Sequence, residues 1–222
     1  MTNDEWNCDG NSTIRHSSFV IRVGVIILAA GASSRMGRPK LLLPWRGATV
    51  LSQLVTQWRE LGAVQIAVVM RPDDTALAAE LDRLAVLAAD RIFNPQPERG
   101  MFSSIVCAAN WSGWRTDLNR WAIVLGDQPH LQRETLKQLL EASARNAEAI
   151  CQPRWDGHGR HPVVLPGTAF AALKTTGAAT LKDFLKLCSS PLVLCSIADP
   201  GLSFDMDTPE DYLRLVNFSR TA

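Results

Sequence analysis

Short apolar runs alternate with amphipathic segments along most of the chain. The runs are rich in Val and Ile, which is typical of strands buried on both faces of a parallel sheet. They lie at residues 23–29, 64–70, 91–93 and 121–125. The segments that predict helices lie at residues 50–61, 75–87, 101–111 and 135–146. This alternation predicts a three-layer α/β fold, with helices on both faces of a mostly parallel, doubly wound sheet.

The alternation changes in the last third of the chain. Residues 149–153 and 161–165 predict two strands, and the polar segment between them predicts a β-hairpin with a mobile, basic tip. An amphipathic helix and a strand at 191–197 follow. Thr208 then supplies a cap, and Pro209 the first position, for a final helix. We expect the hairpin to add an acceptor-binding region to the parallel sheet.

Composition narrows the class of protein. With 222 residues, 46% of them hydrophobic, the chain suffices for one large α/β domain, which we place at residues 23–222. The polar residues 1–22 lack the pattern of a signal peptide and predict a flexible leader. A net charge of +1 and the lack of a membrane-spanning apolar run argue against nucleic-acid and membrane partners. Five scattered cysteines favour free thiols, so we expect a cytoplasmic protein.

The segment after the first strand combines small residues with positive charge. Gly31 and Gly37 allow a ligand to approach the backbone, and Arg35, Arg38 and Lys40 add three cations. Neither G-x-x-x-x-G-K-[ST] nor G-x-G-x-x-G is present, which excludes two common phosphate-binding motifs. An ordinary strand-to-helix loop with surface cations is the alternative. Three cations after so apolar a strand favour a cradle for a triphosphate.

Three acidic residues stand where a metal site could form. Asp127 directly follows the strand at 121–125, and Asp205 and Asp207 precede the last predicted helix. A carboxylate at the carboxyl edge of a parallel sheet can hold Mg²⁺ over a triphosphate. Each acid could instead cap the helix that follows it. Spacing alone does not choose between Asp205 and Asp207.

The segment L-A-A-G-A-S-S-R-M-G-R-P-K at residues 28–40 resembles the signature of the MobA/MocA-like nucleotidyltransferases, most closely the molybdenum cofactor cytidylyltransferases. The resemblance extends over nearly the whole chain from Val23 onward. Further matching stretches lie at residues 94–104, 126–129, 161–164, 177–181 and 205–211. The resemblance implies a GT-A-like, Rossmann-like fold, an NTP donor, Mg²⁺ as cofactor, a molybdopterin-type phosphate acceptor and release of pyrophosphate.

The resemblance also implies roles for individual residues. The residues expected to bind the nucleotide are Leu28, Ala29, Ala30, Gly31, Ser33, Arg35, Lys40, Asn94, Gly100 and Ser103. The residues expected to act in catalysis are Arg35, Lys40 and Asp127, and those expected to bind the metal are Asp127, Asp205 and Asp207. Gln128 and His161 are expected to contact the acceptor. For His161, a strand-end histidine bonded to the backbone is the alternative.

The first loop also bears on the choice of base. Ala29-Ala30-Gly31 and Arg38-Pro39-Lys40 resemble the branch that transfers cytidylyl groups. Members that transfer guanylyl groups tend to have Leu-Ala-Gly-Gly and an Asp before the lysine. The methyl group of Ala30 narrows the slot beside the base, which favours a pyrimidine. CTP is therefore the expected donor.

Other functions stay open at this stage. Residues 176–180 lack charged residues that many relatives carry, so a guanylyltransferase or an enzyme for a sugar or alcohol phosphate is an alternative. A non-catalytic NTP-binding maturation factor for a molybdoenzyme client would keep the basic loop without needing the acids. A flavodoxin-like redox protein would need no paired acids either. Asp127 together with Asp205 and Asp207 favours the nucleotidyltransferase.

Overall fold

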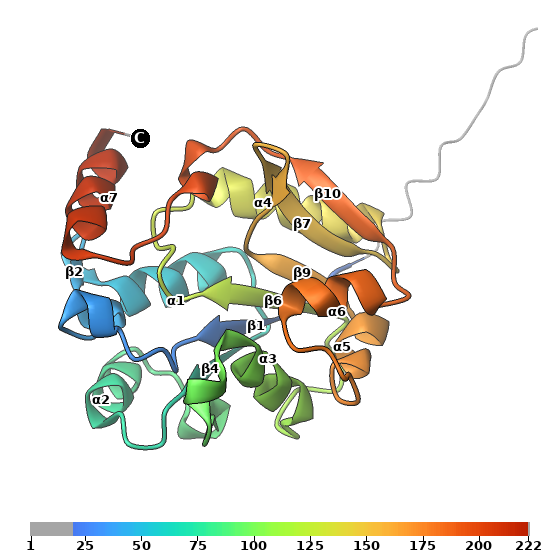
Figure 1. Ribbon diagram of the computed structural model, residues 1–222, viewed down its shortest axis with the longest axis horizontal. Helices are drawn as coiled ribbons and strands as arrows, with labels where there is room; N and C mark the ends of the chain where they lie inside the picture. The colour runs from blue at the N-terminus through green and yellow to red at the C-terminus, as the bar shows by residue number, and fades with distance from the viewer. Residues whose placement is uncertain (1–19, 222) are drawn as a thin grey trace, which may run out of the picture.

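Strand β1 (Val23–Leu28) lies inside the central sheet, between two strands that run parallel to it (Figure 1). In this computed structural model, which describes residues 20–221, the sheet has eight strands. The others are β4 (Gln65–Met70), β5 (Arg91–Phe93), β6 (Arg120–Leu125), β7 (Ile150–Trp155), β8 (His158–Gly159), β9 (Val163–Pro166) and β10 (Leu192–Ser196). Their order is β10-β7-β9-β6-β1-β4-β5, and β8 pairs with β7.

Most strand pairs are parallel, as the alternation of elements predicts. β1 pairs in parallel with β4 and β6, β4 with β5, and β7 with β10. Among the described strands of this sheet, only β9 and the two-residue β8 run antiparallel to their neighbours. Every residue from Val23 to Ile27 is buried, because the strand is covered on both faces. Burial on both faces explains why its apolar run is continuous rather than alternating.

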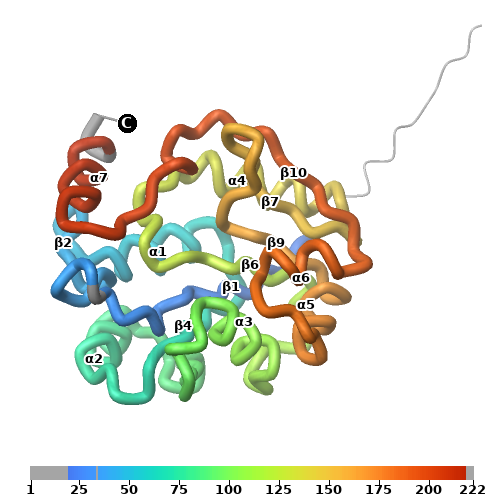
Figure 2. The backbone as a smooth tube through the Cα atoms, in the orientation of Figure 1, coloured from blue at the N-terminus to red at the C-terminus, as the bar shows by residue number. Residues whose placement is uncertain are grey.

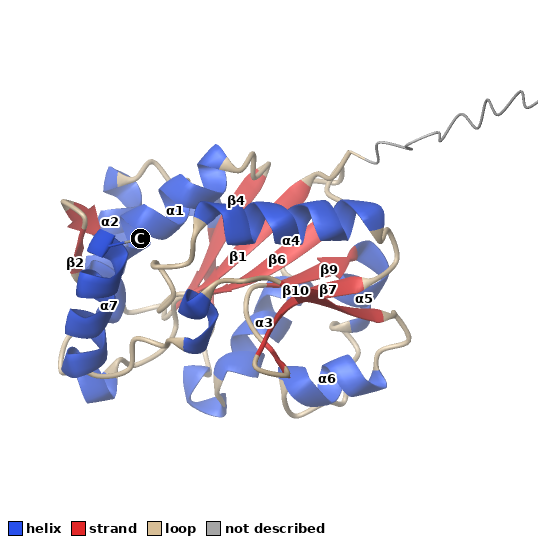
Figure 3. Cartoon of the chain, turned by 90° about the horizontal axis from the view of Figure 1, so that it is seen from above, coloured by secondary structure: helices blue, strands red, loops and turns tan. Residues whose placement is uncertain are grey.

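Two helical layers enclose the sheet (Figure 3). One contains α1 (Val50–Glu60), α2 (Thr75–Arg83), α4 (Arg133–Arg145) and α7 (Pro209–Thr221). The other contains α3 (Met101–Asn110), α5 (Gly167–Ala172) and α6 (Leu181–Leu187). Side chains of β1 alternate between the layers, so that Val25 and Ile27 belong to the first hydrophobic cluster and Ile26 to the second. The predicted three-layer α/β fold is confirmed.

The strand order reverses beside β1. The chain proceeds outward from β1 to β4 and β5, and then returns to β6 on the other side of β1. The register places Leu28 opposite both Val69 and Leu125, so the carboxyl ends of three strands reach one edge. In open α/β sheets, ligands bind in the crevice at such a reversal. The fold therefore directs attention to the segments that follow Leu28 and Leu125.

The predicted hairpin region is present, but its tip is paired. β7 and β9 are antiparallel neighbours, with Cys151 opposite Val164. The connecting segment folds back onto β7 as β8, through a turn at Asp156 and Gly157 whose φ angles are 49° and 75°. Two consecutive residues with positive φ give the type of turn that matches the twist of a two-stranded ribbon. This turn lies in the segment for which the sequence predicts a mobile, basic tip.

Two helix ends differ in how well the sequence predicts them. α2 ends at Arg83, four residues before the predicted end, because Ala85 adopts a left-handed φ of 51° and Val86 N–H donates to the Leu81 carbonyl. α7 begins as predicted. Thr208 Oγ1 accepts from Asp211 N–H at 3.2 Å, and Thr208 N–H donates to Asp211 Oδ2 at 3.0 Å. This reciprocal capping fixes the start of the helix.

The sequence prediction does not include the short helix α5. It also lacks a separate hairpin of β2 (Pro44–Trp45) and β3 (Ala48–Thr49). Trp45 anchors this hairpin, since only 2% of its surface is exposed. α7 lies beside the hairpin although it is far away in sequence (Figure 2), and the Tyr212 hydroxyl donates to the Pro44 carbonyl at 2.6 Å. The last helix is thereby fastened near the first loop.

The predicted leader mostly lies outside the described residues, since the description begins at residue 20. Its last three residues belong to the folded domain instead. Ile21 packs against the first hydrophobic cluster. Arg22 N–H donates to Asn119 Oδ1 at 2.9 Å, and its guanidinium pairs with Asp117. Within residues 20–221, no helix is both long and apolar enough to cross a membrane.

Candidate active site

A cavity of about 390 Å³ opens at the carboxyl ends of β1 and β6. Nucleotide-binding and catalytic residues expected from the sequence line it: Leu28, Ala29, Ala30, Gly31, Ser33, Arg35, Lys40, Gly100 and Asp127. The sequence reasoning did not assign the other lining residues, which are Leu41, Pro97, Met101, Ser104, Leu125 and Gly126. Residues that are far apart in the chain thus meet in one cavity at the predicted edge of the sheet.

The first loop is braced from within. Ser33 takes a positive φ of 49°, and its carbonyl accepts from Met36 N–H at 3.0 Å. Ser33 Oγ accepts from Lys40 N–H at 3.2 Å, which closes the loop around its arginine-containing turn. Met36 and Leu41, 5% and 9% exposed, anchor the loop in the hydrophobic core. The backbone of Lys40 therefore has a fixed position at the cavity wall.

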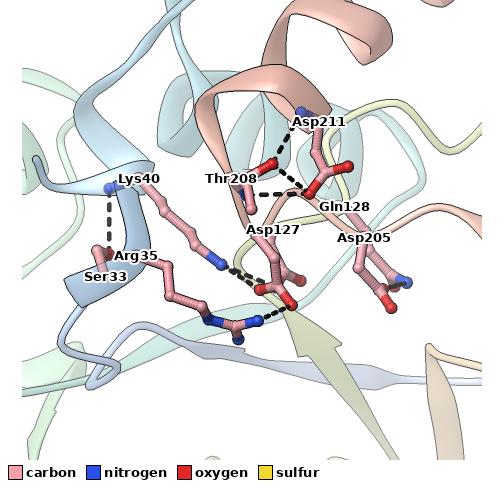
Figure 4. A network of polar contacts seen from close by, with 9 residues as sticks. Ser33, Arg35, Lys40, Asp127, Gln128, Asp205, Thr208 and Asp211 are labelled. Atoms are coloured by element: carbon pink, nitrogen blue, oxygen red, sulfur yellow. Dashed lines mark hydrogen bonds and ion pairs between the residues drawn. The ribbon is translucent and has the colours of Figure 1, made fainter. Parts of the chain in front are cut away.

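Lys40 lies between two acids that come from distant segments (Figure 4). Its Nζ is 2.7 Å from Asp207 Oδ1 and 3.6 Å from Asp127 Oδ2. Arg35 Nη1 is 3.0 Å from Asp207 Oδ2. The Lys40 side chain is only 15% exposed, whereas that of Arg35 is 68% exposed. The lysine is therefore held inside the site, and the arginine stands at its rim.

Asp127 is confined by the close approach of two strand ends. A Cβ atom at Gly126 would lie 2.8 Å from the Leu28 carbonyl oxygen, so only glycine allows this approach. Burial raises the pKa of Asp127, Lys40 opposes this rise, and Asp205 and Asp207 add to it. Within the described structure, Asp127 Oδ1 is buried and has no hydrogen-bond partner. A buried, unpaired carboxylate oxygen is unfavourable unless a cation or another donor meets it.

The helix-capping alternatives for the acids are not what the structure shows. The α4 N-terminus is served by Asp199, whose Oδ2 accepts from Gln132 N–H at 3.2 Å. The α7 N-terminus is capped by Thr208. Asp205 Oδ1 accepts from Gln128 Nε2 at 3.2 Å, and the Lys40 ammonium donates to Asp207, which lowers the pKa of that acid. The three acids are therefore free of capping roles.

The chemistry of these acids fits a hard divalent cation. Carboxylate oxygens are the ligands that Mg²⁺ and Mn²⁺ take in proteins. The orphaned oxygen of Asp127 is a suitable donor. In the part of the chain that the structure describes, however, no three His, Cys, Asp or Glu side chains stand together as a ready metal site. Asp127, Asp205 and Asp207 thus surround one region without forming a preassembled cluster.

Asn94 and Ser103 support the cavity wall rather than line it. Asn94 is 1% exposed, and its Nδ2 donates to the hydroxyls of Ser103 and Ser104 at 2.9 Å. Its Oδ1 accepts from Gln96 N–H at 2.9 Å, so the side chain is satisfied within the protein. These bonds tie the loop after β5 to the first turn of α3. Ser104, in the same turn, is the serine that lines the cavity.

Gln128 and His161, the two predicted acceptor residues, each keep a buried atom without a hydrogen-bond partner among the described residues. These atoms are Gln128 Oε1 and His161 Nδ1. Gln128 is 4% exposed and reaches Asp205 through its other amide atom. Burial lowers the pKa of His161 to about 4, against the opposing effects of a bond to the Ile123 backbone and of Asp205. At neutral pH, both side chains are uncharged polar groups.

Acid should weaken the fold through its buried histidines. The unfolded chain binds a proton on His161 near pH 6.5, but the folded chain does so only near pH 4. Stability is therefore complete above about pH 6.5 and falls as the pH drops from there to about 4. We expect His161 to contribute about 2 kcal/mol of stability loss between pH 7 and pH 5. Burial lowers the pKa of His130 too, which adds loss of the same sign.

Urea unfolding of the wild type and His161→Gln at both pH values measures this contribution. The variant should lose less stability on acidification than the wild type. His158→Gln, at an exposed position in β8, is the matched control and should behave as the wild type. An unchanged pH dependence in His161→Gln would contradict the expectation.

A family model described as the MobA-like NTP transferase domain matches residues 25–191. The chain belongs to the MobA-like NTP transferase family. The resemblance found at residues 28–40 is thereby confirmed, together with the GT-A-like α/β fold of this family. The match ends at residue 191, before Asp205 and Asp207. The folded structure is what brings Asp207 to the family's basic loop.

Two curated relatives match this MobA-like chain over most of their length. Nicotine blue oxidoreductase from Paenarthrobacter nicotinovorans is 29% identical over 201 residues, which is 86% of this chain and 95% of that protein. Molybdenum cofactor cytidylyltransferase from Escherichia coli (strain K12) is 24% identical over 192 residues, which is 86% of this chain and 94% of that protein.

Crystal structures of Rv0371c from Mycobacterium tuberculosis H37Rv share the fold. One aligns with a TM-score of 0.72 at 25% identity, and its complex with manganese aligns with a TM-score of 0.63 at 23% identity. Each alignment covers 88% of this chain and 98% of that chain. These alignments cover a larger share of the chain than residues 25–191, which the family model matches.

Proposed function

We propose that this protein is a nucleotidyltransferase of molybdenum cofactor biosynthesis, which transfers CMP from CTP to a molybdopterin-type phosphate and releases pyrophosphate. One observation carries the proposal most directly. Lys40 of the basic loop meets Asp127 after β6 and Asp207 before α7 at one cavity. Cations and acids together at a sheet edge suit the binding of a metal–triphosphate complex. The family match supports nucleotidyl transfer, and the cytidylyltransferase relative supports CTP as the donor.

In the proposed reaction, the residues of the site bind the substrates and stabilise the charge that develops. An oxygen of the acceptor phosphate attacks the α-phosphorus, and the bond from that phosphorus to the β-phosphate oxygen breaks. Lys40 and Arg35 stabilise the charge that develops on pyrophosphate. Asp127, with Asp205 or Asp207, would hold a divalent cation, which supplies neutralisation of the triphosphate and the leaving group when bound. No general base is needed, since the acceptor phosphate is already anionic.

The acceptor side of the proposal rests on Gln128 and His161. Both are uncharged at neutral pH and both have an unsatisfied buried polar atom, which an incoming polar ligand could satisfy. Gln128 directly follows Asp127, so an acceptor that it binds stands next to the metal-binding acid. A sugar or alcohol phosphate is the alternative acceptor. A molybdoenzyme that receives the product would be the client partner.

A direct assay separates the candidate functions. The protein is incubated with each NTP, Mg²⁺ or Mn²⁺, and molybdopterin, and pyrophosphate release is measured. We expect release with molybdopterin and CTP. A parallel reaction with nicotine blue and a reductant tests the oxidoreductase activity that the name of one relative suggests. NTP binding without pyrophosphate release would favour a non-catalytic maturation factor.

Base preference gives a sharper prediction. Ala30 is 5% exposed at the cavity wall, where its methyl group stands in the way of a wide base. We expect CTP to be used in preference to GTP, and Ala30→Gly to relax that preference by about 1–3 kcal/mol. The measurement is kcat/KM for both nucleotides by pyrophosphate release.

Ala32→Gly is the matched control for this prediction. It adds the same backbone freedom to the same loop, but Ala32 is exposed and lines a neighbouring hollow rather than the main cavity. The control should keep the wild-type preference. A wild-type preference for GTP would overturn the cytidylyl assignment and leave nucleotidyl transfer intact.

A further inference from the structure

The Lys40 ammonium occupies the space between the acids that would hold a divalent cation. Its Nζ contacts Asp207 Oδ1 at 2.7 Å and lies 3.6 Å from Asp127 Oδ2. Arg35 takes the second oxygen of Asp207 at 3.0 Å. Both oxygens of Asp207 are therefore engaged by cations of the protein. Only Asp127 Oδ1, among the carboxylate oxygens of these two acids, is left without a partner in the described structure.

A metal ion and this ammonium group compete for the same oxygens. A Mg²⁺ ion bonds a carboxylate oxygen at about 2.0–2.1 Å, which would place it beside a lysine that already contacts that oxygen. The protonated amine has no lone pair and cannot itself become a ligand. The Lys40 side chain is 15% exposed, so water screens the repulsion between two cations only weakly. The metal can bind fully only if Lys40 leaves.

A bound triphosphate would offer Lys40 an anionic partner other than the two acids. The residue lines the cavity together with the small residues of the first loop. Its backbone is held by Ser33, so the flexible side chain alone can swing from the acids to a phosphate. Arg35 is 68% exposed at the rim and is less confined than Lys40. Movement of the Lys40 side chain therefore controls whether the acids hold the ammonium group or a metal ion.

We propose that Lys40 keeps free divalent metal out of the site and gives up the acids when a triphosphate binds, so that metal and nucleotide enter together. The inference rests on the proposed function in one respect, which is that a triphosphate is the anion that draws Lys40 away. It assigns Lys40 two successive roles, as a substitute cation for the acids and then as a ligand of the phosphates. The benefit is that Lys40 and Asp207 each have a partner of opposite charge both before and after the triphosphate binds.

The test is Mn²⁺ binding, followed by the electron paramagnetic resonance signal of free Mn²⁺. Wild type should bind Mn²⁺ weakly alone, and roughly tenfold or more tightly with the non-transferring analogue α,β-methylene-CTP. Lys40→Met should bind Mn²⁺ alone roughly tenfold more tightly than the wild type, because the competing charge is gone. In this variant the effect of the analogue should be much smaller. Lys182→Met, an exposed lysine of α6, is the control and should match the wild type.

Lys40→Gln repeats the measurement if Lys40→Met does not fold, and circular dichroism checks both. Equal Mn²⁺ affinity in the wild type and a folded Lys40 variant overturns the inference, and so does the absence of Mn²⁺ binding in all proteins. The proposed function fails separately, through missing pyrophosphate release. Tighter Mn²⁺ binding by the variant, together with no pyrophosphate release by the wild type, would uphold the competition and reject the reaction.

Discussion

Asp127→Asn should lower kcat/KM for transfer by roughly 10²–10³-fold while leaving the protein folded. The amide keeps the shape of the carboxylate but offers no anionic oxygen to a cation. Burial raises the pKa of Asp127, so the charged form is already disfavoured in the fold. Removing the charge should therefore leave thermal stability unchanged or slightly higher. This combination of lost activity and retained stability distinguishes a functional acid from a structural one.

Pyrophosphate release and thermal unfolding, measured on the same preparation, check this expectation. Asp156→Asn is the matched control, because Asp156 stands in the β7–β8 turn with a positive φ that asparagine also tolerates. The control should retain full activity. Near-normal turnover of Asp127→Asn at saturating metal would remove Asp127 from the mechanism.

Lys40→Ala should reduce transition-state stabilisation by roughly 2–4 kcal/mol, and Arg35→Ala by less than about 1 kcal/mol. The difference follows from exposure, since the side chains are 15% and 68% exposed, respectively. A charge that water screens weakly acts more strongly on a developing negative charge. The effect of Lys40→Ala should appear mainly in kcat/KM for the nucleotide.

Steady-state kinetics of both variants and of Arg38→Ala test this ranking. Arg38 carries the same charge as Arg35 in the same loop but does not line the cavity. Its variant should resemble the wild type. If Lys40→Ala and Arg38→Ala had the same small effect, Lys40 would be no more than a surface cation.

The sequence predicts the sheet edge well, because parallel pairing has a simple geometric consequence. Apolar runs that end at Leu28 and Leu125 become neighbours in a parallel sheet, and whatever follows them meets at one edge. The basic loop and Asp127 could thus be placed together without any structure. The family match confirms the family resemblance that the loop carries.

Contacts between residues that are distant in the sequence, and the burial of individual side chains, could not be predicted in this way. Lys40 and Asp207 are 167 positions apart, and the spacing of Asp205 and Asp207 does not show which one reaches the loop. In the structure, Asp207 forms ion pairs with the cations of the first loop, and Asp205 accepts a hydrogen bond from Gln128. The polar side chain of Asn94 makes it a candidate for ligand binding in the sequence. Its burial beneath the loop depends on tertiary packing, which no local sequence pattern reveals.

Local rules also miss elements that tertiary packing decides. The short helix α5 begins at Gly167, directly after Pro166, and this pair of residues is typical of a turn. The helix is stabilised by Phe170, whose ring stacks on Trp121 with the ring centroids 4.4 Å apart. The sequence predicts helix α2 up to residue 87, because Leu77, Leu81 and Leu84 lie on one face of it. The left-handed conformation of Ala85 ends the helix, although glycine is the usual residue there.

The contacts that hold α7 against the rest of the domain limit how far the chain can be shortened. The helix is capped by Thr208, joined to the β2–β3 hairpin through Tyr212 and anchored by buried Leu215. Asp207 immediately precedes this cap, so its position at the cavity depends on a helix that the family match does not include. A gene shortened to the matched residues would lose the edge strand β10 and both later acids. We therefore expect the smallest unit with the proposed transferase activity to extend beyond residues 25–191.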